Sequence, residues 1–550
     1  MLNTSPSLSS PIPGISGGDD IEAKLEEFEQ AERQRLGLAV AKGQHWRDLN
    51  LQCFTRRQRA TTTILFGGLT HVQDQLISGA LAGLGYKVVA LDVPNTQALR
   101  FGKEFGNRGQ CNPTYFTVGN LLKYLTNLRD EQGLSVKQIA DDYILLTAGA
   151  CGPCRFGTYA TEFRKALRDA GFENFRVLLF QQQGGLWQAT GKELGLVFNP
   201  SFFLAVLKAV IAGDVLNLVG YRLRPYELHQ GATNAAVDEC KEILNQALRE
   251  RTSFLMALIR CRSVLDAVEV NRLQPKPKVS VIGEFWAMTT EGDGNYRLQT
   301  FLESEGAEVD IQPVTAWVLY NIWEHRFDTK RRMSMCREDE EGQGLKGTNV
   351  RTKLAMLWFA EQALRKWFTL YAWLIGLGRY SLPNMDEMAT ISHQYYDNHL
   401  RGGEGHMEVG KLIQSVEERK AHMVVSIKPF GCMPSSGVSD GVQSLITARY
   451  PEAIFCAVET TGDCAVNVQS RVQMDLFKAR KAAIKEYERA LTEAGLTQEE
   501  AEARLQGTRR TRTLYYPRHT LAGTAANHIA ELIALAPNRQ PSSHHSGRKK

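Results

Sequence analysis

The sequence contains little that would carry the chain into a membrane or out of the cell. Residues 1–20 are rich in Ser, Pro and Gly, and they lack the apolar core of a signal peptide. The apolar run near Trp367–Leu377, which we take as the longest, is roughly half as long as a membrane span. We interpret this run as part of a buried helix, and we expect a cytoplasmic protein with no membrane contact.

A strong excess of one charge is also missing. The chain has 65 Lys and Arg against 60 Asp and Glu, which gives a formal net charge of +5 over 550 residues. No basic stripe with interleaved aromatic residues is present, so nucleic-acid binding is not expected. The phosphate-binding motif GxxxxGK followed by Ser or Thr is absent too. GGLT at 67–70 follows an apolar run, as a tight turn into a helix would.

The length and the hydropathy pattern indicate an α/β protein with more than one domain. With 550 residues, the chain exceeds what a single core usually supports. Short apolar runs alternate with helical patterns, which predicts parallel strands joined by crossover helices. The expected strands are TTILFG (62–67), KVVALD (87–92), YILLT (143–147), FRVLLF (175–180), VSVIGE (279–284), 307–312, MVVSIKP (423–429) and AIFCAVE (453–459).

Composition shifts divide this pattern into segments. The stretch NRLQPKPKVSVIGE carries prolines just before a new strand, so we place a domain boundary near Gln274. We predict two doubly wound Rossmann-like domains with helical insertions, one of them at about 350–378. The expected segments are a disordered start with a charged helical arm over 1–60, a first domain over 61–274, a second over 275–535 and a disordered tail over 536–550.

Cysteine, by contrast, is plentiful, with ten in the chain. Cytosolic thiols stay reduced, so grouped cysteines there indicate metal binding or catalysis instead of disulfides. Loops rich in Gly and Pro lead into helices, whose N-termini favour thiolate, and soft thiolates bind iron–sulfur clusters. Our candidate ligands are Cys111 in GNRGQCNPTYFT (106–117), Cys151 and Cys154 in LLTAGACGPCRFGTY (145–159), and Cys432 in VSIKPFGCMPSSGVSD (425–440).

The CxxC at 151–154 has other interpretations. It also suits a thioredoxin-like redox pair or half of a zinc site, although no second CxxC accompanies it. The remaining cysteines lack such loops. Cys456 suits a core strand, Cys240 and Cys261 lie in helical patterns, and Cys464 is a weaker candidate ligand.

Acid–base candidates lie in the second half of the chain. RGGEGHMEVGK (401–411) is predicted to form a flexible polar loop in which Glu404, His406 and Glu408 supply an acid–base pair, or a plain surface loop. Glu284 follows the strand VSVIG at the sheet edge where ligands bind, and there it either faces the site or caps the next helix. Weaker candidates at such edges are Lys428, Glu459, Thr460, Thr461 and Asp463.

Several long motifs resemble those of the 2-hydroxyacyl-CoA dehydratase family. The resemblance covers roughly residues 60–535, and the branch that it resembles most is the carboxy-terminal part of large fused activase–dehydratase-like proteins. The motifs are GNRGQCNPTYFTVGNLLKYL, LLTAGACGPCRFGTYATEFRKALRDAGF, VSVIGEFWAMTTEGDGNYRLQTFLESEGAEVD, VSIKPFGCMPSSGVSDGVQSL and VETTGDCAVNVQSRVQ.

This resemblance implies a cofactor, a partner and a reaction. In the family, three cysteines hold a 4Fe–4S cluster between Rossmann-like domains, and related proteins hold a double-cubane cluster. A separate ATP-dependent activator, itself an iron–sulfur protein, delivers one electron that reduces an acyl-CoA thioester to a ketyl radical, and hydroxide then leaves. The resemblance makes Cys111, Cys151 and Cys432 the three ligands and Cys154 an added one. A homodimer or heterodimer is expected.

The presence of Cys154 leaves more than one function to be expected. Dehydration in the family needs an open iron site for the substrate oxygen, whereas four cysteines on one cubane leave no iron open. We therefore expect either a lyase of the 2-hydroxyacyl-CoA dehydratase type or a non-catalytic iron–sulfur electron-transfer or accessory protein. A colourless, zinc-stabilised α/β binding protein is the third possibility.

Overall fold

The computed structural model divides the chain into two units, Met1–Asn50 and Leu51–Lys550. In the first unit the structure describes Phe28, Ala31, Glu32, Arg35 and Leu36, of which all but Leu36 are helical. Every element below belongs to the second unit. Its described residues are 54–149, 154–181, 185–186, 194–333, 349–378, 380–400 and 404–533.

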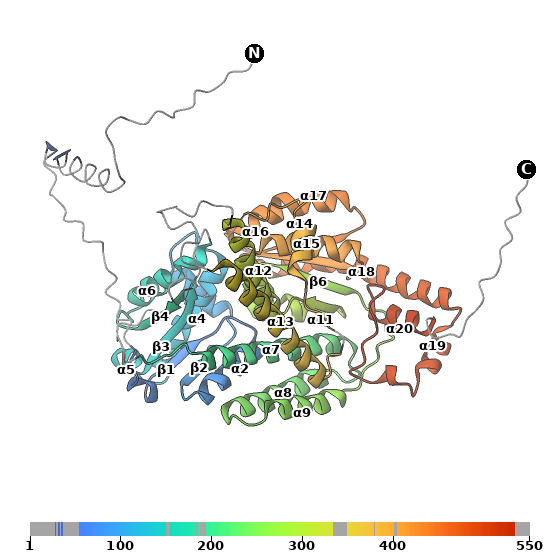
Figure 1. The fold of residues 1–550 in the computed structure, drawn as a ribbon, viewed down its shortest axis with the longest axis horizontal. Helices are drawn as coiled ribbons and strands as arrows, with labels where there is room; N and C mark the ends of the chain where they lie inside the picture. Colours follow the sequence, from blue (N-terminus) through green and yellow to red (C-terminus); the bar gives the residue numbers. More distant parts are fainter. Residues whose placement is uncertain are drawn as a thin grey trace, which may run out of the picture. The chain divides into compact units, whose positions relative to one another are not determined.

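The first sheet has parallel strands in the order β2-β1-β3-β4 (Figure 1). Strand β5 pairs antiparallel with β4 at the edge. Ile64 of the central strand pairs with Val88 on one side and with Ile144 on the other. Ile64 and Ile144 are buried, as central strands of a parallel sheet require. The strands are β1 (Thr63–Phe66), β2 (Lys87–Ala90), β3 (Tyr143–Gly149), β4 (Arg176–Gln181) and β5 (Gly185–Leu186).

The second sheet repeats this order with strands that are all parallel, β7-β6-β8-β9. In each sheet the chain moves first to one side and then crosses to the other. The carboxyl ends of β1 and β3, and of β6 and β8, flank this reversal, which is where open α/β sheets bind ligands. The prediction of an α/β chain with parallel strands is confirmed. The strands are β6 (Lys278–Gly283), β7 (Glu308–Ile311), β8 (Met423–Pro429) and β9 (Ile454–Thr460).

The helices of the first half begin where the sequence provides caps. Thr70 and Gln73 form a reciprocal capping box at the start of α2, so GGLT is a strand-to-helix turn, as predicted. Phe54 is already buried and Gln58–Ala60 form a short helix, so the ordered core starts before residue 61. The helices are α2 (His71–Gly83), α3 (Thr96–Phe105), α4 (Asn112–Asp130), α5 (Val136–Asp142), α6 (Tyr159–Asp169), α7 (Pro200–Leu223), α8 (Ala232–Arg249) and α9 (Phe254–Asp266).

One helix in the described part of the chain, Pro200–Tyr226, is long and apolar enough to cross a membrane by length and composition. Its most apolar window has a mean hydropathy of 2.0, and 67% of that window is buried in the fold, where the helix packs against α2 and α8. The interpretation of the run near Trp367–Leu377 as the longest is therefore wrong. That run does belong to a partly buried helix, with Phe368 and Ile375 in the core.

The second half holds more helices than the sequence predicts. The flexible loop expected at 401–411 is wrong from Gly405 onward, because these residues begin α15 and bury both His406 and Glu408. Met407 and Leu412 draw this segment into the core. The helices are α10 (Phe285–Thr289), α11 (Leu298–Ser304), α12 (Val314–Arg332), α13 (Val350–Ile375), α14 (Met385–Ser392), α15 (Gly405–Glu417), α16 (Met433–Gly437), α17 (Gln443–Arg449), α18 (Ala465–Ala494), α19 (Gln498–Leu505) and α20 (Thr524–Ile533).

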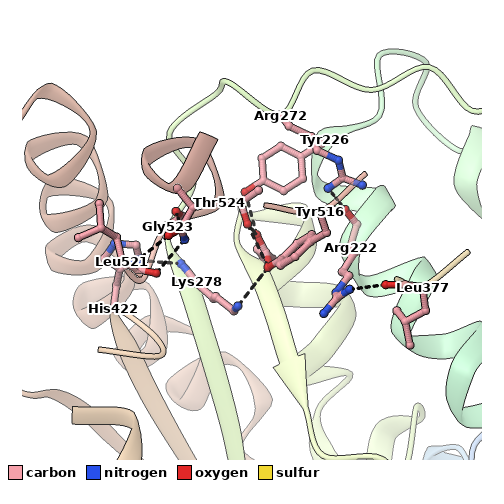
Figure 2. A network of polar contacts seen from close by, with 12 residues as sticks. Arg222, Tyr226, Arg272, Lys278, Leu377, His422, Tyr516, Leu521, Gly523 and Thr524 are labelled. Carbon is pink, nitrogen blue, oxygen red and sulfur yellow. Dashed lines mark hydrogen bonds and ion pairs between the residues drawn. The ribbon is translucent and has the colours of Figure 1, made fainter. Parts of the chain in front are cut away.

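A buried polar network joins the end of the chain to the second sheet and to the first half (Figure 2). Glu308 of β7 accepts hydrogen bonds from the hydroxyls of Tyr226, Tyr516 and Thr524. Lys278 of β6 donates to the Tyr516 hydroxyl over 3.1 Å. Burial acts to raise the pKa of Glu308, but Lys278 and the hydroxyls outweigh it, so this pKa is lowered. Residues from the first half and from the end of the chain thus contact the same buried carboxylate, that of Glu308.

The predicted segment boundaries stay predictions. Gln274 lies between α9 and β6, and the boundary placed there stays a prediction. Residues 536–550, predicted to be disordered, lie outside the described residues.

Candidate metal centre

Cys111, Cys154 and Cys432 each immediately precede a helix. Cys111 caps α4, Cys154 caps the short helix Arg155–Thr158, and Cys432 caps α16. A proline follows in the first turn of α4 and of α16, where its fixed φ suits a helix start. Helix N-termini favour thiolate over thiol. Cys151, the remaining candidate, lies outside the described residues.

The Cys111 loop and the Cys432 loop touch through their backbones. The Asn112 amide donates to the Phe430 carbonyl over 3.1 Å. Gly431 has a φ of +77°, and a Cβ atom there would lie 3.3 Å from the Cα of Cys111. Glycine therefore permits both the left-handed turn and the close approach. The structure brings a loop of the first sheet against a loop of the second.

The side chain of Asn112 strengthens this junction. Its Nδ2 donates to Thr460 Oγ1 over 3.0 Å and to the Gly294 carbonyl over 3.2 Å. Asn112 and Thr460 are both buried. Thr460 ends β9 and was a candidate for lining a ligand cleft; here it holds the start of α4 in place.

The sulfur of Cys111 has two hydroxyl neighbours. Its Sγ lies 3.1 Å from Thr114 Oγ1 and 3.1 Å from the Tyr159 hydroxyl. Tyr159 is the first residue of α6, which follows the Cys154 loop, so this contact links both cysteine loops of the first sheet. Burial first, and then the charge of Cys111, raises the pKa of Tyr159 well above its usual value. The hydroxyl therefore stays protonated and can donate to sulfur.

Two half-buried glutamates lie near the cysteines. Glu284 follows β6 and caps α10, where its Oε2 accepts from the Ala287 amide over 2.8 Å. Glu404 precedes α15, and its Oε1 accepts from the Phe285 amide over 2.6 Å. Burial raises the pKa of Glu284 to about 8 with help from the charge of Glu404, and burial also raises the pKa of Glu404. The pair therefore holds a proton at neutral pH.

The pKa shifts identify the groups that share this site. Burial raises the pKa of Cys154 to about 11, and the charges of Glu284, Cys111 and Glu404 add to the shift. Burial and then Glu284 also raise the pKa of Cys432. Glu284 and Glu404 thus act on both thiols. The site is a half-buried group of acids, with Lys428 and Lys411 beside its carboxyl groups.

Ser435 connects Cys432 with a third carboxyl group, which is fully buried. Its hydroxyl donates to Glu408 Oε1 over 2.9 Å, and hydrogen bonds from Ser435 lower the pKa of Cys432 against the larger effect of burial. Burial raises the pKa of Glu408 to about 8, with the charge of Glu404 adding to the shift. A cavity of about 20 Å³ is lined by Glu404, Glu408 and Lys411, which is room for about one water molecule.

His406 lies in different surroundings. Its ring is centred 4.5 Å from the ring of Trp323 and 4.9 Å from that of Tyr320. Burial lowers its pKa to about 4, so the imidazole is neutral at pH 7. The structure places Glu404 with the cysteines and His406 against the aromatic rings of α12, so the predicted acid–base pair of these two residues stays a prediction.

The structure also shows where the other cysteines and the weaker polar candidates lie. Cys456 is buried in β9, and Cys240 and Cys261 are buried in α8 and α9, as predicted. Within the described ranges no three His, Cys, Asp or Glu side chains form a group that could hold a metal ion. The weaker candidates pair as Glu459 with Lys428 at 3.7 Å, Asp463 with Lys103 at 2.6 Å and Thr461 with Tyr296 at 3.2 Å, and Cys464 is exposed at the start of α18.

Sequence reasoning did not single out Ser435, Tyr159 or Asn112. Ser435 carries a usable signal, because it stands three residues after Cys432, in the first turn of the helix that this cysteine caps. Tyr159 contacts a residue 48 positions away, and Asn112 contacts one 348 positions away. Such contacts form only when distant parts of the chain pack together, so no local sequence pattern predicts them.

Comparison with models of known protein families finds none that matches this chain, and comparison with curated proteins finds no match either. The function is therefore argued from the site itself.

Proposed function

We propose that this chain is a 2-hydroxyacyl-CoA dehydratase-like iron–sulfur protein that performs one-electron chemistry on a CoA thioester. The observation that carries the proposal is that Cys111, Cys154 and Cys432 each lie at the start of a helix and that Glu284 and Glu404 influence the pKa of both Cys154 and Cys432. The family motifs around these cysteines supply the reaction class. A separate ATP-dependent activator, also an iron–sulfur protein, provides the electron, and the pair works in the cytoplasm.

The donor set suits an iron–sulfur cluster, 4Fe–4S or double cubane. Thiolates are the ligands that such clusters take, and Cys151 lies three residues before Cys154 in the sequence. Burial and neighbouring carboxylates raise the pKa of Cys154 and Cys432, so these thiols stay protonated unless a cation joins them. A bound metal centre supplies that positive charge and deprotonates coordinating thiols outright.

Other residues are placed to tune such a centre. Hydrogen bonding by the Ser435 amide and hydroxyl lowers the pKa of Cys432, and the Tyr159 hydroxyl lies 3.1 Å from the Cys111 sulfur. Hydrogen bonds to ligand sulfurs stabilise negative charge and so help to set a cluster's reduction potential.

When bound, a cluster of this kind supplies a low-potential electron for the thioester carbonyl. The remaining work falls to protons, and Glu284 and Glu404 are our candidates for it. Because the pair holds a proton at neutral pH, one carboxyl group can protonate the departing hydroxyl oxygen, which then leaves as water. The other carboxylate remains as a base. His406 is neutral and shielded by aromatic rings, so its contribution as an acid–base group requires an opening of α12.

The alternative is a non-catalytic electron-transfer or accessory protein of the same type. One observation favours it: the charge of Cys111 influences the pKa of Cys154, so Cys154 stands with the family-type ligands and not apart from them. A cubane held by Cys111, Cys151, Cys154 and Cys432 has no iron left for a substrate oxygen. Cys154 thus separates the two functions experimentally.

The test is anaerobic purification of the wild type and of single Cys→Ala variants, followed by iron, sulfide and zinc analysis and EPR spectroscopy. Cys111→Ala and Cys432→Ala are expected to lose the cluster. Cys456→Ala is the matched control, because this buried thiol lies within β9, and its iron content should equal that of the wild type. Iron that survives Cys154→Ala supports the dehydratase, whereas its loss supports electron transfer. A colourless, zinc-containing wild type would refute both.

A further inference from the structure

The first half of α13 is apolar but not buried. The buried residues of this helix all lie from Leu364 onward. Before that point, Met356 and Phe359 are each 66% exposed, and Trp358 is 50% exposed. Single exposed apolar residues are ordinary, but a contiguous group of large ones marks an interaction surface.

The exposed side chains form one line along the helix, which we call the α13 stripe. Leu370 and Trp373, which are 43% and 64% exposed, continue it to the end of the helix. The intervals alternate between three and four residues, which is the spacing of a coiled-coil seam. At 1.5 Å per residue the stripe is about 26 Å long. Its members are Met356, Phe359, Ala363, Lys366, Leu370 and Trp373, all of them exposed.

The opposite side of α13 is fixed to the protein, so the stripe has a set direction. Glu361 lies 3.2 Å from Arg326 of α12 and 3.1 Å from Arg365 of its own helix. Arg365 also donates to the carbonyls of Leu382 and Pro383 over 3.1 and 2.9 Å. A rigid helix that presents an apolar seam loses little conformational entropy on binding.

We propose that the α13 stripe is a dimer interface that packs antiparallel against the same stripe of a second copy of this chain. A two-fold axis makes such a contact self-complementary. Antiparallel pairing places Met356 against Trp373 and Phe359 against Leu370 of the other copy. The small Ala363 then meets Lys366. Parallel pairing would instead place Lys366 against the identical lysine, a repulsion between like charges.

The exposed area is sufficient for a dimer. With about 200 Å² for a fully exposed large side chain, the four apolar residues of the stripe leave about 500 Å² uncovered in each copy. Two copies together would bury about 1,000 Å², the lower limit for a specific interface, before flanking residues such as Trp358 are added. The seam is narrow, with Lys366 within it, whereas a helix that lies in a membrane surface needs a broad apolar face. The inference does not depend on the cluster.

Analytical ultracentrifugation of the full-length protein tests this proposal. The wild type is expected at twice the 61.5 kDa chain mass at micromolar concentration. Phe359→Glu should weaken the dimer at least about tenfold, because it places a charge in the centre of the seam. Its thermal unfolding should match the wild type, since the side chain is exposed. Phe477→Glu on α18, where the side chain is 55% exposed, is the matched control and should remain dimeric.

A second pair of variants tests the antiparallel register. Ala363→Glu places a carboxylate opposite Lys366 of the other copy and should tighten the dimer about twofold. Adding Lys366→Glu turns that pair repulsive and should weaken the dimer below the wild type. A monomeric wild type, a dimer that Phe359→Glu leaves intact, or a dimer that Ala363→Glu weakens would each overturn the proposal. Binding of the monomer to anionic vesicles through Phe359 would assign the stripe to a membrane surface instead.

Discussion

The amide of Asn112 donates to the carbonyl of Phe430, and this 3.1 Å hydrogen bond joins the two sheets at the candidate centre. It places Cys111, one residue before Asn112, beside Cys432, two residues after Phe430. The geometry of the site therefore depends on the junction between halves as much as on each loop.

Gly431→Ala is expected to disturb the site more than its small size suggests. The φ of +77° disfavours alanine, and the new Cβ would lie 3.3 Å from the Cα of Cys111, a backbone atom that cannot move aside alone. We expect a loss of about 1–2 kcal/mol in the free energy of unfolding, measured with urea, and a lower iron content. Gly437→Ala is the control, because a Cβ there meets open space, and stability should be unchanged or slightly higher.

Asn112→Ala should weaken the junction through its side chain. The change leaves the Gly294 carbonyl and Thr460 Oγ1 without their amide donor in a buried place. Such losses cost about 1–3 kcal/mol each time a buried polar group stays unsatisfied. Asn127→Ala removes a half-buried amide of the same helix, whose side-chain hydrogen bonds lie at the surface, and should stay within about 0.5 kcal/mol of the wild type. Equal effects of both variants would contradict the proposed role of Asn112.

Ser435→Ala is expected to make the reduction potential of a bound cluster more negative. The hydroxyl acts on both Glu408 and Cys432; when its single proton is donated to the sulfur it stabilises the added electron, so its removal takes away that donor. The backbone amide of residue 435 remains, so the cluster itself should persist with normal iron content. Ser436→Ala, a neighbouring hydroxyl, should leave the potential unchanged in the same EPR-monitored redox titration. A shift of the same size in both variants would remove Ser435 from the list of tuning groups.

The stability of the second half should fall in acid because of Glu308. Its pKa is lowered in the folded state, so its contribution is present above the unfolded value of about 4.5 and is lost as pH falls through the folded pKa. Glu308→Gln should cost about 3 kcal/mol at pH 7, since Lys278 is left buried without its carboxylate. The difference from the wild type should shrink below pH 4.5, measured by urea unfolding. The exposed substitution Glu488→Gln should show no such trend.

Much of the fold follows from local pattern. Each of the eight expected strands overlaps an observed parallel strand. Short apolar runs rich in β-forming residues and bounded by polar turns favour strands, so the sequence itself indicates where they lie. The antiparallel edge strand Gly185–Leu186 was missed, because two residues are too few to show the hydrophobic periodicity of a strand. Helix α15 was missed as well. Its glycine-rich start resembles a loop, and its helical character comes from the burial of Met407 and Leu412 against the second sheet.

The site is predictable in part for the same reason. A cysteine before a helix, flanked by Gly and Pro, is a local pattern, and Cys111, Cys154 and Cys432 all lie where it indicates. The charges that decide the chemistry are not local. Glu284 and Glu404 are 120 residues apart in sequence, and their pKa values are raised only because folding buries them together. The aromatic stacking of His406 likewise depends on α12, which the sequence does not place.

The shared buried carboxylate of Glu308 has a consequence for synthesis. The strands of the second sheet leave the ribosome well before Tyr516 and Thr524, whose hydroxyls complete the surroundings of Glu308. Until then a carboxylate at the edge of the core lacks two of its donors, and burying it is costly. Synthesis of the segment that contains Tyr516 and Thr524 is thus the step at which the surroundings of Glu308 can be completed.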